Sequence, residues 1–77
     1  MGEDLATLAK RANDVMRGRA DGFIECRVRS HEPPVLEFQF AGPVEAHKFL
    51  LVRQADRSSP FKYAMAPGRV DTVLEYR

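Results

Sequence analysis

The sequence predicts a small α+β domain, a two-layer sandwich in which two helices cover one face of a four-stranded antiparallel sheet. Two segments repeat apolar residues at helical spacing, whereas four others alternate apolar and polar residues as half-buried strands do. Clusters of glycine and proline separate these segments, and no repeat or linker divides the 77 residues. We therefore expect residues 1–77 to form a single compact domain with the order α-β-β-α-β-β.

The first helix is predicted over residues 3–17. Its apolar residues share one stripe at helical period: Leu5, Leu8, Ala9, Ala12, Val15 and Met16. Acidic residues stand in its first turn and basic residues in its second half, and both placements favour the helix dipole. Gly18 suits the position after the helix, because glycine readily adopts the left-handed conformation that ends helices.

Two alternating segments come next, and we expect them to pair as an antiparallel hairpin. The first covers residues 23–30, and the second ends at Phe40. The side chains predicted to face the helices are Ile24, Cys26 and Val28 in the first and Leu36, Phe38 and Phe40 in the second. Pro33 and Pro34 stiffen the loop between them, because proline fixes its backbone and donates no hydrogen bond.

The second helix is predicted over residues 43–57, with Pro43 at the first helical position, where proline is favoured. The stripe predicted to face the sheet consists of Val44, His47, Lys48, Leu51 and Ala55, with Leu50 beside it. Phe49 and Val52 fall outside this stripe. If they remain exposed, they form an apolar strip that suits a homodimer interface.

Two further strands are predicted at 61–65 and 70–77, joined by a turn at 66–69 whose proline and glycine suit a type II turn. The side chains of the last strand predicted to face the helices are Val70, Thr72, Leu74 and Tyr76. The hydrophobic patterns and right-handed crossovers favour the strand order 3-4-2-1, a circular permutation of the ferredoxin-like order. A plainer two-layer α+β sandwich is the alternative.

Composition excludes several classes of protein. A hydrophobic content of 44% with a net charge of +1 excludes intrinsic disorder, and 12 Lys+Arg against 11 Asp+Glu exclude a strongly basic nucleic-acid module. The longest apolar run, residues 49–52, is too short to span a membrane. The acidic N-terminus is unlike a signal peptide, and Cys26, the one cysteine, cannot form an internal disulfide. A cytoplasmic location is therefore expected.

No constellation of residues points to catalysis, a cofactor or a metal ion. Cys26 lies between apolar residues of a predicted strand, where cysteine usually acts as a small apolar filler. His31 and His47, with a single cysteine, lack the ligand spacing of a zinc site, and the isolated glycines form no phosphate loop. We therefore predict that the protein is not an enzyme; a small nuclease that uses His31 or His47 is a less favoured hypothesis.

The sheet face without helices is the predicted partner-binding surface. Charged residues of both signs are interleaved there with apolar ones, and arginine and aromatic residues often anchor protein interfaces. The residues selected as partner-binding are Arg27, Arg29, Arg69, Phe23 and, in the proline-rich loop, His31. The alternative interpretation of this face is a solvated antiparallel sheet.

A second predicted surface is the basic end of the first helix. It consists of four residues selected as phosphate-contacting: Lys10, Arg11, Arg17 and Arg19. This cluster supports an alternative hypothesis, a small RNA- or DNA-binding domain that also uses the charged sheet face. The aromatic-rich strands of RNA-recognition motifs are missing, so protein binding is the favoured interpretation.

A short arginine-rich chain without catalytic residues is similar, in size and in its lack of motifs, to the small inhibitors carried by phages and other mobile elements. Anti-CRISPR proteins are one such group. The resemblance favours a non-enzymatic module that blocks a surface of a partner protein, as an inhibitor of the anti-CRISPR type. We expect it to act without a cofactor and away from membranes, as a monomer or homodimer.

Overall fold

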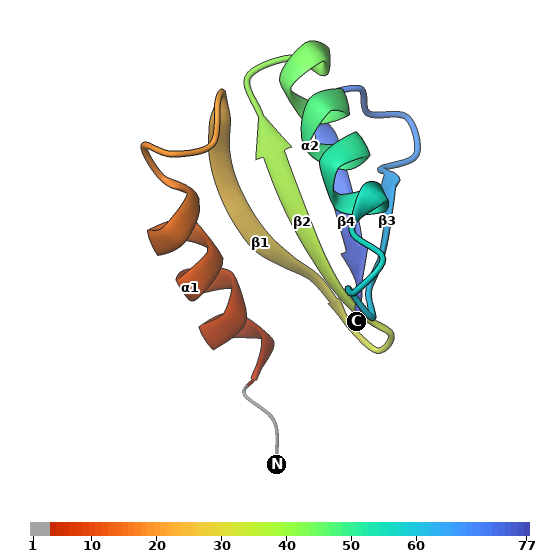
Figure 1. The fold of residues 1–77 in the computed structure, drawn as a ribbon. Coiled ribbons are helices and arrows are strands. Elements are labelled where there is room, and N and C mark those ends of the chain that lie inside the picture. Colours follow the sequence, from red (N-terminus) through yellow and green to blue (C-terminus); the bar gives the residue numbers. More distant parts are fainter. Residues whose placement is uncertain (1–3) are drawn as a thin grey trace.

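The computed structural model describes residues 4–77 as a sheet with two helices on one of its faces (Figure 1). The elements are α1 (Leu5–Met16), β1 (Phe23–His31), β2 (Pro34–Phe40), α2 (Pro43–Ala55), β3 (Lys62–Met65) and β4 (Thr72–Tyr76). Pairing is antiparallel throughout, in the order β1-β2-β4-β3. This is the predicted order 3-4-2-1 counted from the opposite edge, so the α+β fold class and its topology are confirmed.

Helix α1 begins where a side chain caps its first turn. Asp4 accepts a hydrogen bond of 2.8 Å from the backbone N–H of Thr7, as N-terminal caps do. At the other end Met16 is buried against the sheet, and Gly18, with a φ of +74°, adopts the left-handed conformation expected of it. Glu3, the first residue of the predicted helix, lies outside the described residues.

A single side chain of α1 covers part of the outer edge of β1. Asn13 donates a hydrogen bond from Nδ2 to the carbonyl oxygen of Cys26 and accepts one at Oδ1 from the Cys26 N–H, each 2.9 Å long. The amide thus takes the place of a further strand at this residue, because the backbone groups of an edge strand need partners. Nδ2 also donates to the carbonyl of Ala9, 2.9 Å away, which ties the side chain to its own helix.

Helix α2 presents to the sheet a different face from the one predicted. Ala46 and Leu50 are buried, and Phe49 packs against Phe38 and Phe40, with ring centroids 5.1 and 5.0 Å apart. The members of the predicted stripe are all exposed: Val44, His47, Lys48, Leu51 and Ala55. The prediction is wrong because both sides of this helix carry apolar residues, and the large Phe49 ring gains more from burial than a valine does.

A bulge in β1 changes the faces that its first residues occupy. Phe23 pairs with Phe40 and Glu25 with Gln39, so Ile24 is an extra residue without a partner. Phe23 therefore lies on the helix side, where its ring meets that of Phe40 edge-on at 5.9 Å, and Ile24 is 47% exposed. The predicted alternation, which puts Phe23 outward and Ile24 inward, is wrong because the bulge adds a residue to one strand only.

Strand β4 is turned over relative to the prediction. Val73 and Glu75 pair with core residues of β2 and face the helices, whereas Thr72 and Leu74 face the other side. A second, smaller cluster lies on that side and consists of Val35, Ala66 and Leu74. All four residues from 72 to 75 are buried, because β4 is a central strand whose Val73 and Glu75 lie under the helices and whose Leu74 packs with Val35 and Ala66 on the other face, so burial does not alternate along it.

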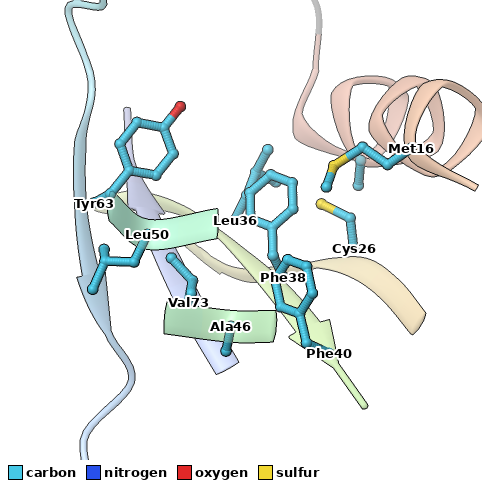
Figure 2. Packing of buried hydrophobic residues seen from close by; sticks show 10 residues of the cluster. Met16, Cys26, Leu36, Phe38, Phe40, Ala46, Leu50, Tyr63 and Val73 are labelled. Carbon is cyan, nitrogen blue, oxygen red and sulfur yellow. The ribbon is translucent and has the colours of Figure 1, made fainter. Parts of the chain in front are cut away.

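The main core lies between the sheet and the helices (Figure 2). Its buried members come from both helices and all four strands: Ala9, Met16, Cys26, Leu36, Phe38, Phe40, Ala46, Leu50, Tyr63 and Val73. In Figure 2 the side chains of Met16 and Cys26 point toward one another, which joins α1 to β1 within the core.

Candidate functional site

A groove runs between the two helices on the covered face of the sheet. Helix α1 packs mainly on β1, and α2 packs on β3, β4 and β2, so the helices stand apart (Figure 1). Three hollows lie along the groove: a wide hollow of about 420 Å³, a central hollow of about 260 Å³ and a far hollow of about 290 Å³. The wide and central hollows share Val15, Met16 and Arg53, and the central and far hollows share Phe49 and Val52, so the groove is continuous.

Apolar side chains line the groove from its floor to its rims. Phe38 and Met16 belong to the buried floor, and Phe49 is half-buried beside them. On the rims, Val15 of α1 and Val52 of α2 are 54% and 65% exposed, although both line the central hollow. A domain of this size has few apolar side chains to spare from its core, and these two exposed valines lie on facing rims of one groove, whereas the equally exposed Val44, Leu51 and Val70 line none of its hollows.

Arginine side chains stand along the same groove. Arg53 of α2 lies over the Phe49 ring, 5.1 Å from its centroid, and Arg77 lies over the Phe61 ring at 4.2 Å. Such cation–π contacts hold a guanidinium plane in place while leaving N–H groups at its edge. Arg19 and Arg53 line the central hollow, and no carboxylate of the described residues lines it with them, so this part of the groove is positively charged.

A buried carboxylate stands at one end of the groove, in the wide hollow. Glu75 is 4% exposed, and its Oε2 accepts a hydrogen bond from the Tyr63 hydroxyl. Arg77 Nε lies 2.7 Å from Oε1 as an ion pair, but its N–H is not aligned for a hydrogen bond, and no described residue donates one to this oxygen. Burial, and then the Glu75 carboxylate, raise the pKa of Tyr63 to about 12, so at neutral pH the hydroxyl keeps the proton that it donates.

The three arginines predicted to bind a partner are engaged within the protein. Arg27 and Arg29 donate hydrogen bonds of 3.0 and 3.1 Å to the two carboxylate oxygens of Glu37, on the sheet face without helices. Arg69 lies 3.3 Å from Asp71 in the loop between β3 and β4. Because β1 and β3 are opposite edges of the sheet, the structure brings Arg27 and Arg29 together but not Arg69.

Phe23 and His31 lie apart from these arginines. Phe23 packs against the core on the helix side, as a consequence of the bulge. His31 is exposed, but it is the last residue of β1 and pairs with Pro34 of β2, so its predicted place in the loop is wrong. The five residues selected from the sequence therefore do not form one surface, and their role in partner binding stays a prediction.

The basic cluster of the first helix is divided between two surfaces. Arg11 lines the wide hollow, and Arg19 lines the central and far hollows, four residues to either side of Val15. Lys10 and Arg17 are exposed and line none of the three hollows. Two of the four predicted phosphate-contacting residues thus belong to the groove.

Potentially reactive groups are buried or dispersed. Cys26 is 2% exposed, and burial, followed by the charge of Glu75, raises the pKa of its thiol to about 12. It therefore packs as a protonated filler, as predicted. Within residues 4–77, His, Cys, Asp and Glu side chains are nowhere grouped in threes that could hold a metal ion, and neither helix has the length and apolar character of a membrane span.

Several residues that line the groove are not among the site residues predicted from the sequence: Phe49, Arg53, Tyr63, Glu75 and Arg77. The signal for the first two is a second stripe of α2, formed by residues 46, 49, 50 and 53 at helical spacing. Glu75 and Tyr63 become neighbours only because β3 pairs with β4. The register of that pairing depends on the length of the loop between the two strands.

No family model, curated protein or solved structure matches this chain.

Proposed function

We propose that the protein is a non-enzymatic protein-binding module that holds a segment of a partner protein in the groove between α1 and α2. The observation that carries this proposal is the continuous apolar groove, with Val15 and Val52 more than half exposed on its rims. Burial of apolar surface drives most protein association, and these side chains have apolar surface left to bury. The arginines beside them supply the polar contacts that fix orientation.

The proposed mode of action is inhibition, in which the small chain occupies and blocks a surface of a larger protein. Small inhibitors of the anti-CRISPR type, encoded by phages and mobile elements, are the model for this role. The proposed compartment is the cytoplasm, where a free cysteine such as Cys26 stays reduced. The groove is complete within one chain, so a monomer or a homodimer suits the proposal equally.

The sheet face without helices supports the same role less well. Its most prominent charges, Arg27, Arg29 and Glu37, already satisfy one another, and desolvating them against a partner is costly. Two of its apolar residues, Val35 and Leu74, are buried and have little surface left to offer, and Tyr76, which pairs with Val35, is 41% exposed.

A second candidate function is nucleic-acid binding, favoured by the basic residues that line the groove: Arg11, Arg19, Lys48 and Arg53. Phosphate contacts make affinity fall steeply with rising salt. A gel-shift series with single-stranded and duplex oligonucleotides tests this function. A shift at physiological salt that is lost on Arg19→Glu and Arg53→Glu supports it, and no shift at low salt refutes it.

Capture with matched variants tests the protein-binding proposal, using a lysate of the organism that encodes the chain. The double variant Val15→Glu/Val52→Glu puts two carboxylates on the rims. Val44→Glu and Val70→Glu change valines that are 74% and 67% exposed elsewhere. We expect wild type and both controls to retain the same protein and the groove variant to lose it. Retention by the groove variant refutes the proposal, and loss in Val44→Glu alone assigns binding to the outer face of α2.

A further inference from the structure

We infer that the groove takes an acidic amphipathic helix of a partner protein, whose apolar residues enter the hollows and whose carboxylates bind Arg19 and Arg53. The inference rests on the proposed function and names the chemistry of the partner segment. Three features of the groove support it: its charge pattern, the state of its arginines, and the absence of an open strand edge along it.

The charge pattern favours a negative occupant at the middle of the groove. The central hollow combines five apolar residues with Arg19 and Arg53, and no carboxylate of residues 4–77 lines it. Carboxylates line only the two ends: Asp21 and Glu45 in the far hollow, Asp56 and Glu75 in the wide hollow. Glu75 is compensated by Arg77 and Tyr63, so it does not repel an acidic ligand. A basic segment would meet two like charges at the centre.

Neither central arginine is held in an ion pair among the described residues, although the Asp56 carboxylate lies close enough to Arg53 to interact with its charge. In the part of the chain that the structure describes, no carboxylate lies within ion-pair distance of Arg19 or Arg53, whereas Arg27, Arg29 and Arg69 each have one. The Arg53 guanidinium carbon lies over the Phe49 ring, 5.1 Å from its centroid, at the groove, and a guanidinium suits two-pronged binding of a carboxylate.

A helix suits the groove better than an extended strand does. Strand addition needs an unpaired sheet edge, but the groove is lined by the side chains of two helices and of the sheet face. The edge of β1 at Cys26, beneath α1, is already occupied by the Asn13 amide. A helix instead projects side chains at i, i+3, i+4 and i+7 from one face, which matches hollows that follow one another along a groove.

Selection from a displayed peptide library tests the inference with the folded full chain as bait. The library holds short helical peptides with leucine, phenylalanine or tryptophan at i, i+3, i+4 and i+7, and with Glu, Lys or Gln randomised at the remaining positions. We expect selected peptides to be enriched in Glu. The best peptide should bind at least about tenfold more weakly to Arg19→Glu/Arg53→Glu, and its Lys-for-Glu counterpart should prefer that variant to wild type.

The outcomes separate the inference from the proposed function. Selected peptides without a preference for Glu that still lose binding to Val15→Glu/Val52→Glu overturn the inference and leave the proposed function standing. No enrichment over an empty bait, or binding that is indifferent to this groove variant, overturns both. Displacement of the selected peptides by an oligothymidylate at physiological salt overturns both in favour of nucleic-acid binding. Circular dichroism of each variant, with Arg19→Gln/Arg53→Gln as a milder pair, verifies that the fold is intact.

Discussion

The contact between Asn13 and the edge of β1 leads to a quantitative prediction about stability. Asn13→Ala removes the two 2.9 Å hydrogen bonds to the Cys26 backbone and the one to the Ala9 carbonyl. At about 0.5–1.5 kcal/mol net for each hydrogen bond, losing the two strand contacts costs about 1–3 kcal/mol. The higher helix propensity of alanine returns up to about 0.7 kcal/mol. The free energy of unfolding should therefore fall by about 0.3–2.3 kcal/mol.

Urea unfolding at neutral pH, followed by far-UV circular dichroism, measures this change as a lower midpoint with an unchanged slope. Asp14→Ala is the matched control, because it changes the exposed neighbour of Asn13 and carries only the gain in helix propensity. If the two variants have the same midpoint, the Asn13 amide does not stabilise the edge of β1, and the reasoning is wrong.

Asn13→Asp tests the same contact through pH. The introduced carboxylate keeps the acceptor for the Cys26 N–H but faces the Cys26 and Ala9 carbonyls without a proton to donate. This repulsion should raise the pKa of the new carboxyl in the folded state above its unfolded value. Stability is then present at low pH and is lost as pH rises through the folded pKa. A variant whose stability does not improve on acidification, relative to wild type, would contradict the assignment.

Three further predictions concern the core and one turn. Folding raises the pKa of the Cys26 thiol from 9.0 to about 12, so the folded state holds this proton more tightly than the unfolded state does. The stabilisation from the protonated thiol is therefore complete below about pH 9. Above that pH the free energy of unfolding falls by up to about 1.4 kcal/mol per pH unit. Urea titrations at about pH 8 and about pH 10 check this, and Cys26→Ser should lose less stability over the same interval than wild type; an equal fall in both proteins would argue against it. Tyr63→Phe removes the hydroxyl that donates to the buried Glu75 carboxylate and should cost about 2 kcal/mol. Adding Glu75→Gln should cost less than the sum of the single changes, and strict additivity would show that the two groups are not coupled. Gly22 and Gly18 both have left-handed backbones, with φ of +71° and +74°, but an added Cβ would lie 2.6 Å from a side-chain carbon of α2 only at Gly22. Gly22→Ala should therefore lower the thermal midpoint more than Gly18→Ala, for which the left-handed penalty alone is about 1–2 kcal/mol, and equal midpoints would exclude the steric contribution.

Periodicity and turn residues were enough to predict the elements and their order in this protein. The stripe of α1 contains its two buried residues, Ala9 and Met16, and the glycine after it has the left-handed backbone predicted for it. The strand order followed from pairing two hairpins under the crossover rule, and the structure has the same order.

The faces of individual strands depend on shifts of pairing register that periodicity does not reveal. The bulge at Ile24 moved Phe23 to the helix side. A tight turn at 66–69 would pair residue 65 with residue 70, but Met65 pairs with Val73. This shift of three positions exchanges the two faces of β4, because side chains alternate with a period of two.

The candidate site was only partly visible in the sequence, because it depends on how far apart two helices stand. Arg11 and Arg19 were selected for their charge, and the structure places both along the groove. Phe49 and Val52 stand out from the sequence only as an apolar strip outside the predicted stripe, and Arg53 does not stand out at all. Because α2 carries apolar residues on both sides, packing of Phe49 against Phe38 and Phe40, rather than periodicity, decides which side is buried.

In the proposed function, a partner protein occupies the groove between α1 and α2. Site-specific photo-crosslinking in living cells tests it most directly, with a photoreactive side chain replacing Val52 in the groove, Val44 on the outer face of the same helix, or Arg27 on the sheet face without helices. We predict a crosslink to one discrete protein from position 52 and none from positions 44 and 27. A partner crosslinked from position 44 or 27 but not from position 52 would contradict the claim.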